Sequence, residues 1–447
     1  MPLKNSRILT HILTYGYPGL VVGAALSGGI VSPLATALFA SAVIFLLLIF
    51  ALKIVLDEDG QLFIPDTLWP FLALIILTLV QSYAWTDRTG VRQSLSLDVE
   101  ATRNSLFIFV ILFGAFLLGA NIFRHTEAQK LLTNFLVIYG LLFAFLALVL
   151  SFAWKQNLTW LKPIENGNPF GPFVNRNHFA GYMELLFPLP VALLLVAQKK
   201  LEQSILYIAA AALMGIALCF SLSRGGMISL GVQLLFLLAL STQSKNKQLT
   251  NHQLKPKLIA IVSIAGIIVL MGLGIYLIGA NSLILRFGDE DDRAQIWLNA
   301  WHIFQAHPWL GTGAGTFETA FPIYALDKGL DVAAEAHSDY LQILSDTGLT
   351  GFVIFLLFLV LLVRTIGKAL RATKPLQTAL ALGSSTSIVG ILVHSFFDFN
   401  LQLPSHALLF FLHVSLCAEI ASVKLQLVKN EVKAPVYQVL PIAKESL

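Results

Sequence analysis

Three charged or titratable side chains stand beside predicted membrane spans, where such groups are costly unless they are paired or bind a ligand. His337 belongs to "AEAHSDYLQILSDTG", directly before the uncharged run "LTGFVIFLLFLVLLV". Arg224 lies in a very short turn, "CFSLSRGGMISL", between two apolar stretches. Arg293 opens "RAQIWLNAW", in which Arg293, Trp297 and Trp301 recur at intervals of four residues. A histidine can act as a general base, and an arginine among small neighbours lets an anionic group approach.

The segment around His337 predicts a helix from about residue 334 that ends at Gly348. His337 then falls in the first turn, where the helix dipole disfavours the imidazolium form and leaves a ring suited to general-base catalysis. The alternative is an interfacial histidine that caps its neighbours or hydrogen-bonds a carbonyl.

Arg224 follows Ser221 and Ser223 and precedes Gly225 and Gly226. These small neighbours favour a site for a bulky anion. The alternative is an arginine that extends its head group to the membrane interface.

A third cluster, "NGNPFGPFVNRNHFAGYMELLFPLP", places Asn175, Arg176, Asn177 and His178 at the mouth of a span and Glu184 about two turns inside it. A carboxylate inside the membrane indicates function by default. The alternative is that Arg176 and the two amides cap the helix while Glu184 pairs with an unidentified neighbour.

The stretch "HSFFDFNLQLPSH" adds His394, Asp398 and His406 on the same predicted side of the membrane. These polar groups either join the site or only satisfy backbone groups at a re-entrant turn.

The elements that hold these residues are membrane helices. The chain has 447 residues, is 57% hydrophobic and 12% charged, and has a mean hydropathy of +0.78. A bilayer span needs about 20 apolar residues. The predicted spans are 10–31, 33–55, 68–85, 105–123, 131–153, 178–197, 203–222, 226–241, 257–278, 349–363, 377–396 and 405–422. The sequence therefore predicts an all-α polytopic membrane protein of about twelve transmembrane helices, with the first span retained.

Lys and Arg residues predict the orientation, because cytoplasmic segments are enriched in them. Most of the 29 basic residues fall on the cytoplasmic side if the N-terminus lies inside. The segment 279–348 then forms one large outer loop, which is periplasmic in a Gram-negative cell. The net charge of +4 is an orientation signal and does not indicate nucleic acid. Cys219 and Cys417 lie within spans and suggest neither a disulfide nor a metal site.

The outer loop should fold, because its charges alternate with Trp, Phe and Ile. A helix is predicted from Asp291 to about His307, since Pro308 disfavours its continuation. The glycines of "GTGAGTF" predict a tight turn and not a nucleotide loop. The acidic run "DEDD" at 289–292 has no accompanying ligands, so we expect a solvated helix start and no metal.

The segments "RAQIWLNAWHIFQAHPWLGTGAGTF" and "AHSDYLQILSDTGLTGF" resemble the O-antigen ligase and polymerase superfamily. The Ser-Arg-Gly turn at 223–225 and "NRNHFAGY" look like the same superfamily. The resemblance covers about residues 165–400 of a single membrane domain, 1–447. Ser338 departs from the pattern, since Asn is commoner there, but the histidine stays in place.

The resemblance implies a glycosyltransferase of the GT-C type, which transfers a glycan from undecaprenyl diphosphate at the periplasmic face of the bacterial inner membrane. His337 would be the base, with Arg224 and Arg293 holding the leaving diphosphate. Asn175, Arg176, His178, Trp297 and Tyr340 would contact substrate. The transfer would be inverting and would need no metal, cofactor or nucleotide sugar.

The aromatic residues Trp297, Trp301, Trp309 and Tyr340 could stack on sugar rings, and an interfacial aromatic belt explains them equally well. The acceptor stays open between lipid A-core, as in a ligase, and a second lipid-linked glycan, as in a polymerase. A different class is a multi-span permease for a small anion, and a third is an assembly scaffold. Polar residues gathered at one face favour catalysis, because transporters usually bind at mid-membrane.

Overall fold

The computed structural model describes residues 4–30, 32–57, 61–90, 92–154, 169–196, 200–243, 293–325 and 333–433. Helices make up 79% of these residues. The helices are α1 Lys4–Leu26, α2 Pro33–Leu56, α3 Leu68–Gln81, α4 Val99–Ile122, α5 Thr126–Val149, α6 Arg176–Leu186, α7 Pro188–Val196, α8 Leu201–Phe220, α9 Arg224–Gln243, α12 Arg293–Ala306, α13 Phe317–Tyr324, α14 Asp339–Ala369, α15 Pro375–His394 and α16 Pro404–Lys433. A π-helical turn, Leu150–Trp154, extends α5, and the 3₁₀ turn Asn400–Gln402 precedes α16.

The lengths of these helices fit a bilayer. Within the described residues, nine spans are long and apolar enough to cross a membrane, with α6 and α7 together forming one of them. The apolar helices α3 and α9 are shorter. The prediction of a polytopic helical membrane protein is therefore confirmed. The predicted span 257–278 lies outside the described residues, and every other predicted span coincides with one of these helices.

One element departs from the all-α prediction. Two short strands, β1 Ala84–Thr86 and β2 Arg92–Ser94, pair in antiparallel fashion between α3 and α4. Gly90 adopts a left-handed φ of 83°, and Asp87 accepts a hydrogen bond from the Thr89 backbone at 2.9 Å. This turn chemistry favours a hairpin, so the predicted span 68–85 extended too far and α3 ends at Gln81.

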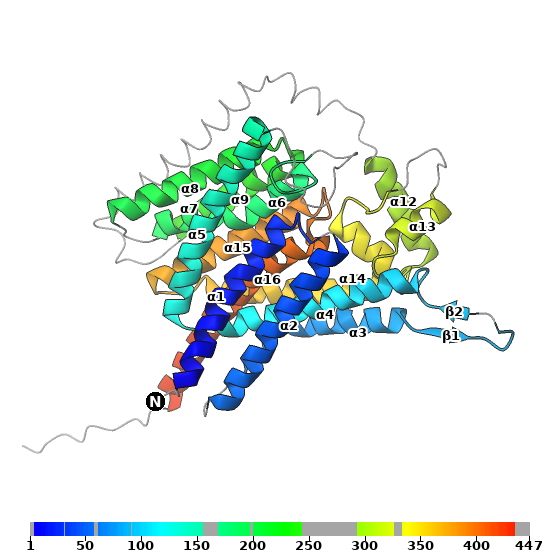
Figure 1. The fold of residues 1–447 in the computed structure, drawn as a ribbon, viewed down its shortest axis with the longest axis horizontal. Helices are drawn as coiled ribbons and strands as arrows, with labels where there is room; N and C mark the ends of the chain where they lie inside the picture. The colour runs from blue at the N-terminus through cyan, green and yellow to red at the C-terminus, as the bar shows by residue number, and fades with distance from the viewer. Residues whose placement is uncertain are drawn as a thin grey trace, which may run out of the picture.

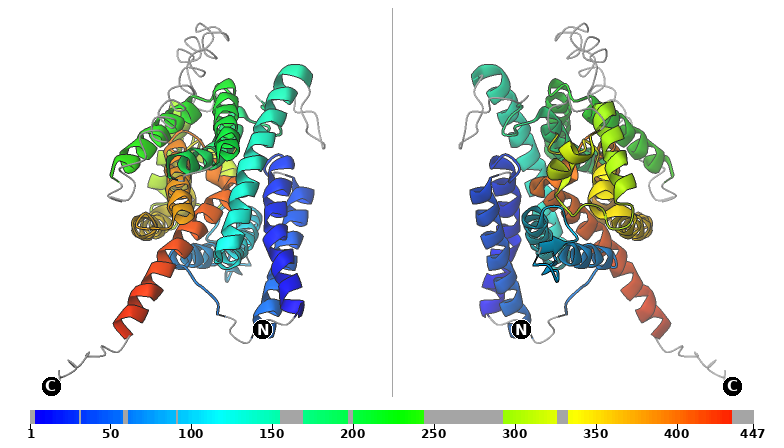
Figure 2. Two further views of the ribbon diagram at one scale, coloured as in Figure 1. Left: turned by 90° about the vertical axis from the view of Figure 1, so that its left-hand side faces the viewer. Right: turned by 90° about the vertical axis from the view of Figure 1, so that its right-hand side faces the viewer.

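The most buried helices lie at the centre of the bundle. α6 and α7, α15, and the first part of α16 bury most of their residues, with α15 packed on α7 and α9 and α16 packed on α4, α14 and α15. Figure 2 shows α1 and α2 as a pair along one side of this bundle. In Figure 1, α12 and α13 lie at the end of the bundle where α14 begins.

The outer loop folds as predicted over its described part, 293–325. α12 and α13 enclose a small apolar core with Ala336, which includes Ile303, Phe317 and Phe321. The glycine turn between them is bound to α14, because Thr312 N donates to Ser345 O at 3.0 Å and Gly313 N to Asp346 O at 2.9 Å. α12 is thereby held close to the segment that carries His337.

Candidate functional site

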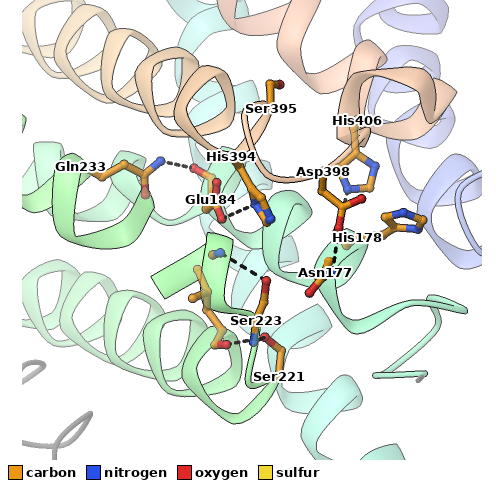
Figure 3. Close-up of polar contacts among 12 residues, drawn as sticks. Asn177, His178, Glu184, Ser221, Ser223, Gln233, His394, Ser395, Asp398 and His406 are labelled. Atoms are coloured by element: carbon orange, nitrogen blue, oxygen red, sulfur yellow. Dashed lines mark hydrogen bonds and ion pairs between the residues drawn. The ribbon is translucent and has the colours of Figure 1, made fainter. Parts of the chain in front are cut away.

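The site forms where five chain segments meet. Figure 3 shows the side chains from α6, from the turn before α9 and from the end of α15 and the turn that follows it. The first residues of α6, α9 and α12 come together with the segment before α14 and the turn between α15 and α16. The sequence prediction that these polar segments share one side of the protein is therefore confirmed.

Asp398 is the residue on which the side chains converge. Its side chain is completely buried. Asn177 Nδ2 donates to Oδ2 at 2.6 Å, the Phe399 backbone N–H donates to Oδ1 at 2.9 Å, and His337 Nδ1 lies 3.3 Å from Oδ1. A buried carboxylate is tolerated when it accepts several hydrogen bonds and faces positive charge.

Arg293 docks the first turn of α12 onto the same segment. Its Nη1 donates to the Phe397 carbonyl at 2.9 Å, and its Nη2 lies 3.7 Å from Asp398 Oδ2. Trp297, one turn later, donates from Nε1 to the His337 carbonyl at 3.3 Å. The Arg-x3-Trp spacing thus places one residue on the Asp398 turn and the other on the histidine backbone.

The structure corrects the predicted helix around His337. α14 begins at Asp339, with Ser338 as its N-cap position, so His337 precedes the helix and does not lie in its first turn. The reason is its left-handed φ of 48°, which a helical residue cannot adopt. The predicted break at Gly348 is present, although α14 resumes beyond it across a kink with φ 61° and ψ −163°.

A second set of contacts ties the His337 segment to the Asp398 turn. Asp339 Oδ2 accepts hydrogen bonds from Ser395 Oγ at 2.7 Å and from the Leu401 backbone at 3.2 Å. In return, the Asp339 backbone N–H donates to the Ser395 carbonyl at 2.9 Å. These reciprocal bonds fix both segments on either side of the His337–Asp398 pair.

The surroundings of Asp398 keep it ionised. Burial acts to raise its pKa, but the hydrogen bond from His337 and the electrostatic effect of the nearby His178, Arg293 and His337 side chains outweigh it. The pKa of Asp398 is therefore lowered below its ordinary value. An ionised carboxylate favours the histidine tautomer that donates a hydrogen bond to it, and the His337 atom that faces Asp398 is Nδ1.

Arg224 is the first residue of α9 and is half-buried, as expected for a residue in a short turn. Ser223 Oγ caps the helix by accepting from Gly226 N at 3.2 Å. The following residue, Gly225, packs against His394 and Phe397. This packing brings the beginning of α9 to the turn that carries Asp398.

Glu184 has a partner that the sequence did not identify. His394 Nδ1 lies 2.8 Å from Glu184 Oε1, and both side chains are buried (Figure 3). A second histidine, His406, donates from Nε2 to the His178 carbonyl at 2.6 Å. The polar residues of "HSFFDFNLQLPSH" therefore pair with side chains and backbone groups from α6 and the loop before α14.

The remaining predicted substrate residues take different places. Asn175 caps α6 by accepting from Asn177 N at 2.9 Å, and Arg176 is half-buried at the start of the same helix. His178 stacks edge-on against Phe399. Tyr340 donates its hydroxyl to Leu392 O at 2.6 Å and its ring packs on Phe396, beside an apolar cavity between α3, α14 and α16.

The aromatic pair Trp301 and Trp309 is exposed. Among the residues that the structure describes, His, Cys, Asp and Glu form no group of three with metal-binding geometry. The acidic run 289–292 lies outside the described residues.

Comparison with known proteins supports the resemblance. Residues 209–356 match the model of the family described as O-antigen ligase, which confirms the resemblance to the O-antigen ligase and polymerase superfamily. The matched region contains Arg224, Arg293 and His337. Asp398 and the Glu184–His394 pair lie outside it. No curated protein matches the chain.

Proposed function

We propose that this protein is an inverting, metal-independent membrane glycosyltransferase of the GT-C type, which transfers a glycan from undecaprenyl diphosphate to an acceptor hydroxyl. The reaction takes place at the periplasmic face of the bacterial inner membrane. The match of residues 209–356 to the O-antigen ligase family supports the class of reaction. The observation that carries the mechanism is the buried Asp398 carboxylate with His337 at 3.3 Å and Arg293 at 3.7 Å.

His337 acts as the general base. Asp398 accepts a hydrogen bond from His337 Nδ1–H and so orients the ring, which leaves Nε2 to take the proton of the acceptor hydroxyl. The left-handed backbone at His337 lifts the residue out of α14, and its side chain keeps 28% of its surface exposed. An acceptor can therefore reach a histidine whose carboxylate partner is buried.

The acceptor oxygen attacks the anomeric carbon of the donor glycan from the side opposite the diphosphate. A new carbon–oxygen bond forms as the bond to the diphosphate oxygen breaks. The proton of the acceptor passes to His337, and the diphosphate leaves with the bonding electrons. Arg224 and Arg293 stabilise the charge that develops on the leaving group, because guanidinium groups match phosphate oxygens.

The test is complementation of cells that lack the gene. Wild type should restore a long surface glycan, whereas His337→Ala, Arg224→Ala and Arg293→Ala should accumulate the lipid-linked donor at equal membrane levels. His11→Ala is the matched control, because His11 is exposed on α1. Attachment of the restored glycan to lipid A-core identifies a ligase, and attachment to a second lipid-linked glycan identifies a polymerase. Full complementation by all three variants would overturn the proposal.

A further inference from the structure

The first turn of α9 packs closely against α6 and α15 at two glycines, Gly225 and Gly226. A Cβ atom on Gly226 would lie 2.7 Å from Ala180 Cβ and 3.3 Å from Glu184 Oε1. One on Gly225 would lie 2.7 Å from Cδ2 and 2.8 Å from Nε2 of His394. The two glycines allow an approach that an alanine would prevent.

The two glycines face the side chains of Glu184 and His394, which form a hydrogen-bonded pair. Glu184 from α6 and His394 from the end of α15 are separated by 210 residues in the chain and are joined at 2.8 Å. Gln233, two turns along α9, donates to the Glu184 carbonyl at 2.8 Å (Figure 3). The pair therefore joins α6 to α15, and Gln233 joins α9 to the same residue of α6.

The Gly225–His394 contact lies next to two residues of the proposed mechanism, Arg224 and Asp398. Gly225 is adjacent to Arg224 in the chain. The His394 carbonyl accepts from the Phe397 and Asp398 backbone N–H groups, at 2.7 and 3.1 Å, so His394 also holds the turn that carries Asp398. His394 thus lies against the helix that begins with Arg224 through its imidazole and holds the turn that carries Asp398 through its backbone carbonyl.

We propose that His394, held by Glu184, is a positioning residue that sets the place of Arg224 relative to the His337–Asp398 pair. This inference rests on the proposed function, since the consequence of correct placement is tight binding of the donor diphosphate. The side chains of His394 and Glu184 are 1% and 0% exposed, so we do not expect either to touch the substrate. Their loss should weaken donor binding and leave the chemical step largely intact.

A suppressor pair tests the contact directly. Gly225→Ala adds a methyl group that overlaps His394. His394→Asn can keep the donor to Glu184 but lacks the Cδ2 and Nε2 atoms that the methyl group meets, so each single variant should disturb the first turn of α9. In the double variant the methyl group occupies the space that the shorter side chain leaves. The control is Gly231→Ala on the same helix, where a Cβ would meet nothing within 4 Å.

The readout is steady-state transfer by the full-length chain in detergent, at matched membrane expression. Each single variant should raise the donor KM by about tenfold and leave kcat within about twofold, as for a lost binding interaction. The double variant should restore the KM to nearer the wild-type value than either single variant does, and Gly231→Ala should behave as wild type. Three outcomes would each overturn the proposal. The increases in donor KM could multiply in the double variant, kcat could fall at unchanged KM, or the single variants could match wild type.

Binding of farnesyl diphosphate to the same purified variants separates this inference from the proposed function. If wild type transfers no glycan but its diphosphate binding follows the suppressor pattern, the positioning role stands and the transferase proposal fails. If wild type transfers glycan but the suppressor pattern is absent from both KM and diphosphate binding, the positioning role fails alone. If wild type neither transfers glycan nor binds the diphosphate, both proposals fail.

Discussion

His337 Nδ1 lies 3.3 Å from Asp398 Oδ1, although 61 residues separate the two in the chain. Asp398 is fully buried and His337 is partly exposed. The carboxylate can therefore orient the imidazole, while only the imidazole is accessible to the hydroxyl of an acceptor substrate. A buried carboxylate that fixes the tautomer of a histidine is a recurrent arrangement for a general base.

Asp398→Asn should therefore lower turnover while the protein still reaches the membrane. The amide keeps the shape of the carboxylate but cannot provide the negative charge that holds a proton on His337 Nδ1, so kcat should fall by about a hundredfold or more, as for other histidine–carboxylate pairs. Glycan transfer by the purified variant measures the effect, and the exposed Asp66→Asn is the control. Wild-type turnover in Asp398→Asn would show that the pair only holds the fold together.

The same lowered pKa predicts how Asp398 contributes to stability against pH. A carboxyl group whose folded pKa is depressed stabilises the protein above its ordinary value, about 4, and loses that contribution only as the pH falls through the lower folded value. The contribution that the ionised Asp398 makes to stability should therefore decrease as the pH falls below about 4. Thermal unfolding of wild type and Asp398→Asn between about pH 5 and pH 3 measures it, and an advantage of wild type that does not shrink over this acid range would contradict the expectation.

Much of the fold could be predicted from the sequence, because a membrane span requires a long apolar segment and leaves a clear signal. The orientation of the spans also placed Asn177, Arg224, His337 and Asp398 on one side. The pairing of Glu184 with His394 could not be predicted. The sequence indicates that each of these polar residues needs a partner, but it does not identify the partner. The partner is selected by helix packing over 210 residues.

The backbone at His337 was unpredictable for a related reason. Its surrounding sequence suits a helix from about residue 334, but tertiary bonds between the Ser395 segment and Asp339 accompany a helix that begins only at Asp339. The hairpin between α3 and α4 was missed although its turn carries a signal, "DRTG". Each strand has only three residues, which is too short for an alternating pattern to be recognised.

Gln81→Met should destabilise the glycine turn that supports the site. The buried amide of Gln81 donates to Leu310 O at 2.6 Å and to Asp346 O at 2.8 Å, and it accepts from Ala314 N at 3.2 Å. Methionine fills the space but removes the Gln81 hydrogen bonds of the Leu310 carbonyl and the Ala314 N–H, whereas the Asp346 carbonyl still accepts from Gly313 N at 2.9 Å. The two lost bonds cost about 2–4 kcal/mol in all. The unfolding temperature should fall relative to wild type. Gln93→Met, on the exposed hairpin, should leave it unchanged.

Gly348→Ala should be more disruptive than its size suggests. Gly348 adopts φ 61° and ψ −163°, a region open essentially to glycine alone, and a Cβ there would lie 2.5 Å from the Trp309 carbonyl carbon. We expect a strain of about 1–3 kcal/mol in addition to the overlap, with a lower unfolding temperature and less protein in the membrane. Gly367→Ala is the control on the same helix, because its Cβ would meet nothing within 4 Å. Equal stability of the two variants would show that the kink is not required.

Glu335→Gln should change how stability depends on pH. Burial and the neighbouring carboxylates of Asp346, Asp339 and Glu318 raise the pKa of Glu335 from 4.5 to about 8. Between these values the folded protein keeps a proton that the unfolded chain releases, so wild-type stability should decrease as the pH rises from 4.5 towards 8 and then level off. Glutamine cannot titrate, and the unfolding temperature of the variant should rise relative to wild type over this interval. Thermal unfolding at pH 5.5, 7 and 8.5, three values chosen to span roughly that interval, measures it, with the exposed Glu202→Gln as the control. A wild-type and a Glu335→Gln curve that run parallel would show that Glu335 is ionised in the folded protein at neutral pH.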